Sequence, residues 1–156
     1  MSSQYYLQET EVHLKLCEDG CRKLYSTSRI NSPDDAVNVL ADLLRQYDHE
    51  LCVVVNLDGA NHPINYTTIG IGETTQCPVA TENIFRSALL SGAAKILLIH
   101  NHPSENPEPS PEDRELTQRL AAAGHVIGIP LMEHVIVAGP KMYSFYRDAR
   151  ELLIDF

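Results

Sequence analysis

Hydrophobic residues along the chain follow two different spacings, one typical of strands and one typical of helices. Residues 51–57 and 96–99 are short, nearly continuous apolar runs, which indicate strands buried within a sheet. Residues 33–47 and 82–91 place apolar side chains three and four positions apart, which predicts helices with one buried face. Because strands and helices alternate along the chain, the pattern predicts an α/β protein.

Turn and cap residues set the limits of the remaining elements. Asp58-Gly59 predicts a hairpin after the first buried strand, Thr81 is expected to cap a helix, and Gly92 and Gly124 predict helix ends. We expect further strands at 11–17, 64–71, 126–129, 134–137 and 142–145, and further helices at 111–123 and 147–154.

The most informative stretch begins where the apolar run 96–99 ends. If that strand continues through His102, then His100 and His102 point to the same side, because side chains alternate along a strand. Prolines exclude regular structure in the loop that follows, and Ser110-Pro111 is typical of a helix start. Asp113 then lies in the first helical turn. Two imidazoles and one carboxylate suit zinc, with a fourth position left for water.

Each part of this pattern has a simpler explanation when it is taken alone. A His-x-His pair is more often an ordinary part of a strand, and Asp113 could serve only in the helix cap. The tripeptide His-Asn-His on its letters also suggests a nuclease. The complete spacing favours a metal site: His-x-His, seven residues, Ser, two residues, Asp.

Composition and charge narrow the classes of partner. The chain has 156 residues, which fits one domain with a sizeable core. Its formal net charge is −9 and no cluster of Lys or Arg is visible, so direct nucleic-acid binding is disfavoured. No apolar run is long enough for a membrane span and the start has no secretory signal, so we expect a cytoplasmic protein.

His100-x-His102-Pro103, Ser110 and Asp113 resemble the JAMM motif of JAB/MPN metalloproteases. The wording His-Asn-His-Pro-Ser followed by Pro-x-Pro-Ser is similar to the bacterial RadC-like branch, and the resemblance extends over about residues 48–138. It implies a mixed β-sheet flanked by helices in a single domain, the JAB/MPN (cytidine deaminase-like) architecture. We expect that domain at 32–156, and an N-terminal extension at 1–31 whose strand packs at the edge of the core.

The resemblance also implies roles for individual residues. His100, His102 and Asp113 would hold Zn²⁺, and Ser110 would stabilise the developing oxyanion, although an ordinary N-cap is the simpler role for Ser110. Glu50 would be the general base, since a Glu begins the corresponding strand in RadC-like sequences eight residues before Leu-Asp or Leu-Asn ends it, and Glu50 stands eight residues before Asp58. Without the resemblance, Glu50 is only a polar strand boundary.

Two other acidic residues compete with Glu50 on the sequence alone. Glu73 lies in a Gly-rich loop and Glu82 fits the first turn of a helix, so both have structural explanations. His134 is expected to be a core histidine, with an outer role beside the metal as the alternative.

The function implied is that of a zinc-dependent metallopeptidase or isopeptidase acting on a peptide or protein. The alternatives are a non-catalytic metal-binding interaction module and a metal-dependent protein associated with DNA repair. RadC-like proteins often have an upstream helix-hairpin-helix module that binds DNA. We expect none in this chain, which weakens the DNA-repair alternative. A homo-oligomer is compatible with the sequence.

The chain departs from the RadC-like pattern at two places. Val79-Ala80-Thr81-Glu82-Asn83 stands where Val-His-Pro-Arg-Glu is usual, which would alter binding of a substrate or partner. Glu105 stands where Gly usually follows His-Pro-Ser. Neither departure removes a ligand, so we expect metal binding to survive.

Overall fold

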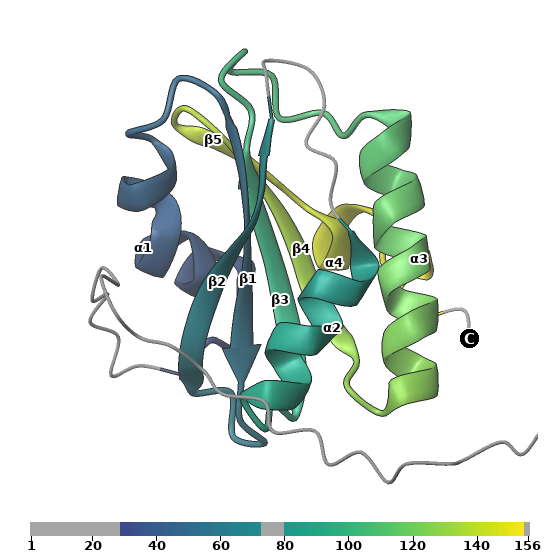
Figure 1. Ribbon diagram of the computed structural model, residues 1–156. Helices are drawn as coiled ribbons and strands as arrows, with labels where there is room; N and C mark the ends of the chain where they lie inside the picture. Colours follow the sequence, from purple (N-terminus) through teal and green to yellow (C-terminus); the bar gives the residue numbers. More distant parts are fainter. Residues whose placement is uncertain (1–28, 73–79, 155–156) are drawn as a thin grey trace, which may run out of the picture.

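The computed structural model describes residues 29–72 and 80–154, which form one sheet with helices on both of its faces (Figure 1). The predicted strand at 11–17 and Glu73 lie outside these residues. The elements, in chain order, are α1 (Pro33–Leu44), β1 (Glu50–Leu57), β2 (Pro63–Gly72), α2 (Thr81–Leu90), β3 (Lys95–Asn101), α3 (Pro111–Ile127), β4 (Leu131–Ala138), β5 (Lys141–Ser144), α4 (Phe145–Asp148) and α5 (Glu151–Ile154).

The sheet has five strands in the order β2-β1-β3-β4-β5. β1 is antiparallel to both β2 and β3, β3 is parallel to β4, and β4 is antiparallel to β5. The predicted mixed sheet flanked by helices is therefore confirmed. Its register sets Cys52 of β1 opposite His100 of β3, and Leu98 of β3 opposite His134 of β4.

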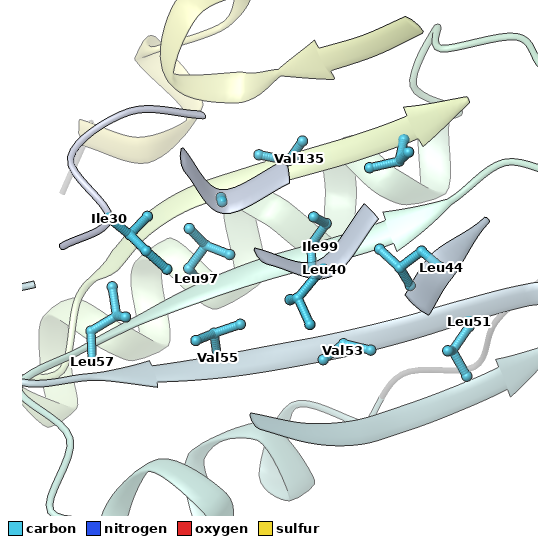
Figure 2. Close-up of a cluster of buried hydrophobic side chains, with 12 residues drawn as sticks. Ile30, Leu40, Leu44, Leu51, Val53, Val55, Leu57, Leu97, Ile99 and Val135 are labelled. Atoms are coloured by element: carbon cyan, nitrogen blue, oxygen red, sulfur yellow. The ribbon is translucent and has the colours of Figure 1, made fainter. Parts of the chain in front are cut away.

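One face of the sheet packs against α1 through a cluster of apolar side chains. Alternate residues of the two central strands, among them Val53, Val55, Leu97 and Ile99, meet Leu40 of α1 in one cluster (Figure 2). All of these side chains are almost fully buried. Burial of one such side chain contributes about 1.5–3 kcal/mol, so this face stabilises the fold.

The opposite face packs against α2 and α3, which lie on the other side of the sheet from α1 (Figure 1). Val54 and Leu98 meet Phe85 of α2 and Leu120 of α3 there. Because side chains alternate along a strand, the even-numbered residues of β1 and β3 face these helices, and His100 is one of them.

α3 continues four residues beyond the predicted end at 123, and the strand expected at 126–129 is wrong. Gly124 lies inside the helix because the chain returns directly against it, and a Cβ there would stand 2.6 Å from the carbonyl O of Ile129. Gly128 instead ends the helix, in the left-handed conformation with φ of 80°. Gly124 is therefore required for a close backbone contact rather than for a helix end.

Other boundaries also differ from the prediction. Thr81 is the first residue of α2, and Ala80 occupies the N-cap position without a side-chain hydrogen bond. α1 ends at Leu44 rather than at 47. The helix expected at 147–154 is two short helices, because Ser144 caps α4 and the backbone leaves the helical region at Ala149.

Within residues 29–72 and 80–154, no helix combines the length and the apolar character needed to cross a membrane.

Candidate metal centre

Two histidines reach one point on the α3 face of the sheet from the end of β3. His100 lies within β3, while His102 is one residue beyond its end. The backbone N–H of His102 still donates to the carbonyl of Val137 in β4, at 2.8 Å. The extended conformation therefore continues, and the two rings lie side by side with centroids 4.9 Å apart. The predicted same-side placement of the two imidazoles is confirmed.

Asp113 is brought to the same point by the start of α3. Ser110 is the N-cap, and it forms a capping box with Asp113. The Ser110 hydroxyl and backbone N–H both donate to Oδ2 of Asp113, at 2.8 and 2.7 Å, and Ser110 Oγ accepts from the Asp113 N–H at 3.1 Å. The cap therefore orients the carboxylate, so the structural role of Asp113 is compatible with metal binding.

Lone pairs of the three side chains converge. His102 Nδ1 lies 2.9 Å from the carbonyl O of Asn106, which can only accept, so in the neutral ring Nδ1 has the proton and Nε2 has the lone pair. That Nε2 lies 3.0 Å from Nε2 of His100 and 3.5 Å from Oδ2 of Asp113. Asp113 Oδ1 is 3.2 Å from Nε2 of His100. A cation placed between these atoms would stabilise the cluster.

The spacing of these atoms fits a metal ion. Zinc bonds to imidazole and carboxylate are about 2.0–2.2 Å long, so neighbouring corners of a tetrahedron stand about 3.3–3.6 Å apart. The observed separations of 3.0, 3.2 and 3.5 Å are close to that value. In the described part of the chain, His100, His102 and Asp113 form the group of ligand atoms that could hold a metal ion.

The charges of the cluster shift its pKa values in the direction that favours a cation. Burial would raise the pKa of Asp113, but its close contacts with His100 and His102 outweigh burial and hold that pKa well below its ordinary value. Burial would lower the pKa of His102, but Asp113, the Asn106 carbonyl and the charge of Glu50 together raise it. A negative potential thus surrounds the two rings.

Glu50 begins β1 on the same face of the sheet. Since Cys52 pairs with His100 in an antiparallel register, Glu50, two residues before Cys52, lies beside the region of His102. It is half-buried, and its charge makes the smallest of the contributions that raise the pKa of the His102 imidazole. The rival Glu82 is exposed in the first turn of α2.

Asn101 holds the segment that contains Glu50, a role that no local sequence pattern predicts. Its side chain accepts from the Leu51 N–H at 2.7 Å and donates to the His49 carbonyl at 3.0 Å. These two contacts lie on either side of Glu50, and Asn101 is only 4% exposed. The middle residue of His-Asn-His therefore holds the start of β1 in place.

His134 is fully buried behind His100. Its Nε2 lies 2.9 Å from Nδ1 of His100, its Nδ1 lies 2.7 Å from Oγ1 of Thr117, and its ring stacks on Phe145 at 4.7 Å. Burial places the pKa of His134 well below its ordinary value, so the ring is neutral. No local sequence pattern marks Thr117, although it lies one helical turn beyond Asp113.

Glu105 shows why glycine is usual at its position in RadC-like chains. Its φ is 58°, in the left-handed region that side chains avoid, while its N–H donates to the His102 carbonyl at 3.1 Å. The side chain lies over Gly139, and its Cδ would stand 3.5 Å from a Cβ added there. The departure from glycine therefore strains the loop without removing a ligand.

Comparisons with known proteins agree with this architecture. The family model "RadC-like JAB domain" matches residues 30–152. A UPF0758 protein of Salinibacter ruber is 42% identical over 116 residues, which cover 74% of this chain and 50% of the relative. A UPF0758 protein of Rubrobacter xylanophilus is 43% identical over 108 residues, which cover 69% of this chain and 48% of the relative. A UPF0758 protein of Caldanaerobacter subterraneus is 39% identical over 131 residues, which cover 81% of this chain and 56% of the relative.

The chain spans about half the length of these curated relatives. The names of the relatives state no activity. The family match covers the whole sheet, α1 to α4 and the three clustered side chains. This chain therefore belongs to the RadC-like JAB domain family.

Proposed function

We propose that the chain is a zinc-dependent hydrolase of the JAMM type, a metallopeptidase or isopeptidase that cleaves an amide bond in a peptide or protein. The observation that supports it is the convergence of His100, His102 and Asp113 at hydrogen-bond distances, with Glu50 on the same face of the sheet. Three protein ligands leave one corner of a tetrahedron for water or substrate, as in catalytic rather than structural zinc sites.

Zinc is the metal we propose for this ligand set. Two imidazole nitrogens and a carboxylate oxygen are the donors of known catalytic zinc sites, whereas magnesium and calcium favour oxygen ligands. When bound, zinc polarises a carbonyl and makes water a better nucleophile near neutral pH. His100, His102 and Asp113 would hold it.

We assign the transfer of the proton to Glu50. It takes a proton from the water that attacks the amide carbonyl, and it returns that proton to the leaving nitrogen as the C–N bond breaks. Its half-buried position next to the rings would let its carboxylate reach both the water and the leaving group.

Ser110 is assigned to the oxyanion. Its hydroxyl now donates to Asp113 Oδ2 at 2.8 Å, so this role requires that hydroxyl to turn from the carboxylate to the substrate oxygen. The backbone N–H of Ser110, at 2.7 Å from the same oxygen, would keep Asp113 oriented during that turn.

The experiment that tests the proposal is a screen of peptide and isopeptide substrates with the zinc-loaded protein. We expect cleavage that a chelator abolishes and that zinc restores. Glu50→Gln should retain one zinc per chain and lose turnover by at least 100-fold, which is within the usual contribution of a general base. Glu82→Gln is the matched control, because Glu82 is an exposed glutamate outside the cluster, and it should remain active.

Two results would contradict the proposal. Zinc binding without turnover of any substrate would favour the non-catalytic metal-binding module. Salt-sensitive binding to DNA by the zinc-loaded chain would favour the association with DNA repair instead.

A further inference from the structure

A chain of hydrogen bonds runs behind the metal-ligand cluster, from the backbone of α3 to the ring of His100. It begins at Thr117, whose hydroxyl donates to the carbonyl of Asp113 at 2.7 Å. The carbonyl oxygen has no proton to give, so the direction of this first hydrogen bond is fixed. Thr117 Oγ1 can therefore only accept from any further partner.

That further partner is His134. Its Nδ1 lies 2.7 Å from Thr117 Oγ1, so Nδ1 has the proton and donates it. In a neutral imidazole the other nitrogen then has a lone pair, and Nε2 of His134 can only accept. The stacked ring of Phe145, inclined by 5°, holds His134 in this orientation.

The direction passes in the same way to His100. Its Nδ1 lies 2.9 Å from Nε2 of His134, and since that atom can only accept, His100 Nδ1 must be the protonated nitrogen. The lone pair of His100 is then on Nε2, which lies 3.2 Å from Oδ1 of Asp113. The series of contacts thus starts at the backbone carbonyl of Asp113 and returns to the carboxylate of the same residue.

We propose that Thr117 and His134 are positioning residues that set the tautomer of His100, so that its Nε2 is free to bind the metal. This inference rests on the metal site of the proposed function. It goes further because it assigns a task to two residues that touch neither metal nor substrate. We call the hydrogen bonds from the Asp113 carbonyl through Thr117 and His134 to His100 the relay. It joins the ligand His100 on β3 to the ligand Asp113 on α3.

Packing alone does not require these groups. Thr117 and His134 are both 0% exposed, and an apolar side chain of similar shape would fill either place without the cost of burying a hydroxyl and an imidazole. The carboxylate or carbonyl that usually orients a ligand histidine is here replaced by a second histidine. A histidine accepts only in one tautomer, which is why the relay needs Thr117 at its far end.

The test compares Thr117→Val, which keeps the shape and loses the hydroxyl, with Thr117→Ser, which keeps the hydroxyl. We expect Thr117→Val to weaken zinc affinity by about 10- to 100-fold in competition with a chromophoric chelator, and Thr117→Ser to bind as the unchanged protein does. Thermal unfolding of the metal-free variants checks that both are folded.

Nitrogen NMR of the metal-free, histidine-labelled protein reports which ring nitrogen of His100 has the proton. A merely structural role of Thr117 would leave that position unchanged. We expect the proton of His100 on Nδ1 in the unchanged protein and in Thr117→Ser, and a mixture of tautomers in Thr117→Val. A proton on Nε2 of His100 in the unchanged protein would overturn the relay, even if Thr117→Val failed to fold. Equal zinc affinity of the two variants would also overturn it.

These readouts are separate from those of the proposed function. Neither the zinc affinity nor the tautomer depends on turnover, so the relay stands if the zinc-loaded protein cleaves no substrate. Conversely, a fully active Thr117→Val protein with unchanged zinc affinity would remove the relay and leave the hydrolase intact.

Discussion

The two faces of the central sheet come from the same strands and differ in what their side chains do. Toward α1, odd-numbered residues of β1 and β3 such as Val53 and Ile99 form an apolar cluster. Toward α2 and α3, the even-numbered residues Val54 and Leu98 form apolar packing, whereas His100, further along β3, is a candidate metal ligand. A strand alternates its side chains, so one segment supplies a core on one face and ligands on the other.

This difference implies that stability and metal binding can be changed separately. None of the three metal-ligand side chains belongs to the apolar cluster on the α1 face. The hydrogen bonds that orient these ligands come from α3, β4 and the loop before α3. A change on one face should therefore alter the fold, and a change on the other should alter the metal site.

The largest expected effect is on the α1 face. Leu40→Ala removes a side chain that is 1% exposed, and we expect the free energy of unfolding to fall by about 2–5 kcal/mol in urea denaturation. The zinc affinity of the folded fraction should stay unchanged. A loss of zinc affinity in parallel with stability would show that the two faces are coupled.

The complementary change is His102→Ala on the other face. We expect zinc affinity to fall by more than about 100-fold, beyond the loss typical of an outer hydrogen-bond partner, because a ligand itself is removed. His125→Ala is the matched control, since His125 is exposed near the end of α3. Chelator competition measures both, and similar affinities for the two variants would contradict the assignment of His102.

A smaller effect is expected at the strained loop between the two groups of ligands. Glu105→Gly should raise the free energy of unfolding by about 1 kcal/mol, because glycine adopts the observed φ of 58° without steric cost. Glu108→Gly in the same loop has no positive φ to relieve and should not stabilise. Equal changes in the two midpoints of urea unfolding would argue against strain at Glu105.

The smallest effect concerns pH. Burial raises the pKa of Glu133 above its ordinary value of 4.5, although hydrogen bonds from the Tyr146 N–H and Ser144 oppose the rise. The folded protein then binds the proton more tightly than the unfolded chain does, so this contribution is present at pH below 4.5 and is lost as pH rises through the raised pKa.

Glu133→Gln removes that titration. We expect the unchanged protein to lose stability relative to this variant between pH 4 and pH 7, as measured by urea unfolding at a series of pH values. A constant difference between the two proteins across that range would contradict the raised pKa.

The sequence predicted the elements of the fold where one spacing was clear, and it failed where tertiary contacts decided. The buried strands and the convergence of His100, His102 and Asp113 followed from alternation, prolines and cap chemistry. The helix end predicted at Gly124 is wrong, because a close backbone contact and a helix end both favour glycine and only the folded chain distinguishes them. The roles of Glu50 and Ser110 came from the family resemblance and stay predictions.

The residues behind the ligands could not be predicted in the same way. Thr117, His134 and Asn101 act through hydrogen bonds between elements that are far apart in the sequence, such as the one from His100 to His134. No local spacing reports such a contact. The outer role of His134 was one of two alternatives, and its hydrogen bonds to His100 and Thr117 now support it.

The most direct test of the central claim is anomalous diffraction at the zinc edge from crystals grown with zinc. We predict one strong peak, about 2.0–2.2 Å from Nε2 of His100, Nε2 of His102 and a carboxylate oxygen of Asp113, with no fourth protein ligand. The absence of a peak between these three side chains, or a fourth side chain closing the site, would contradict it.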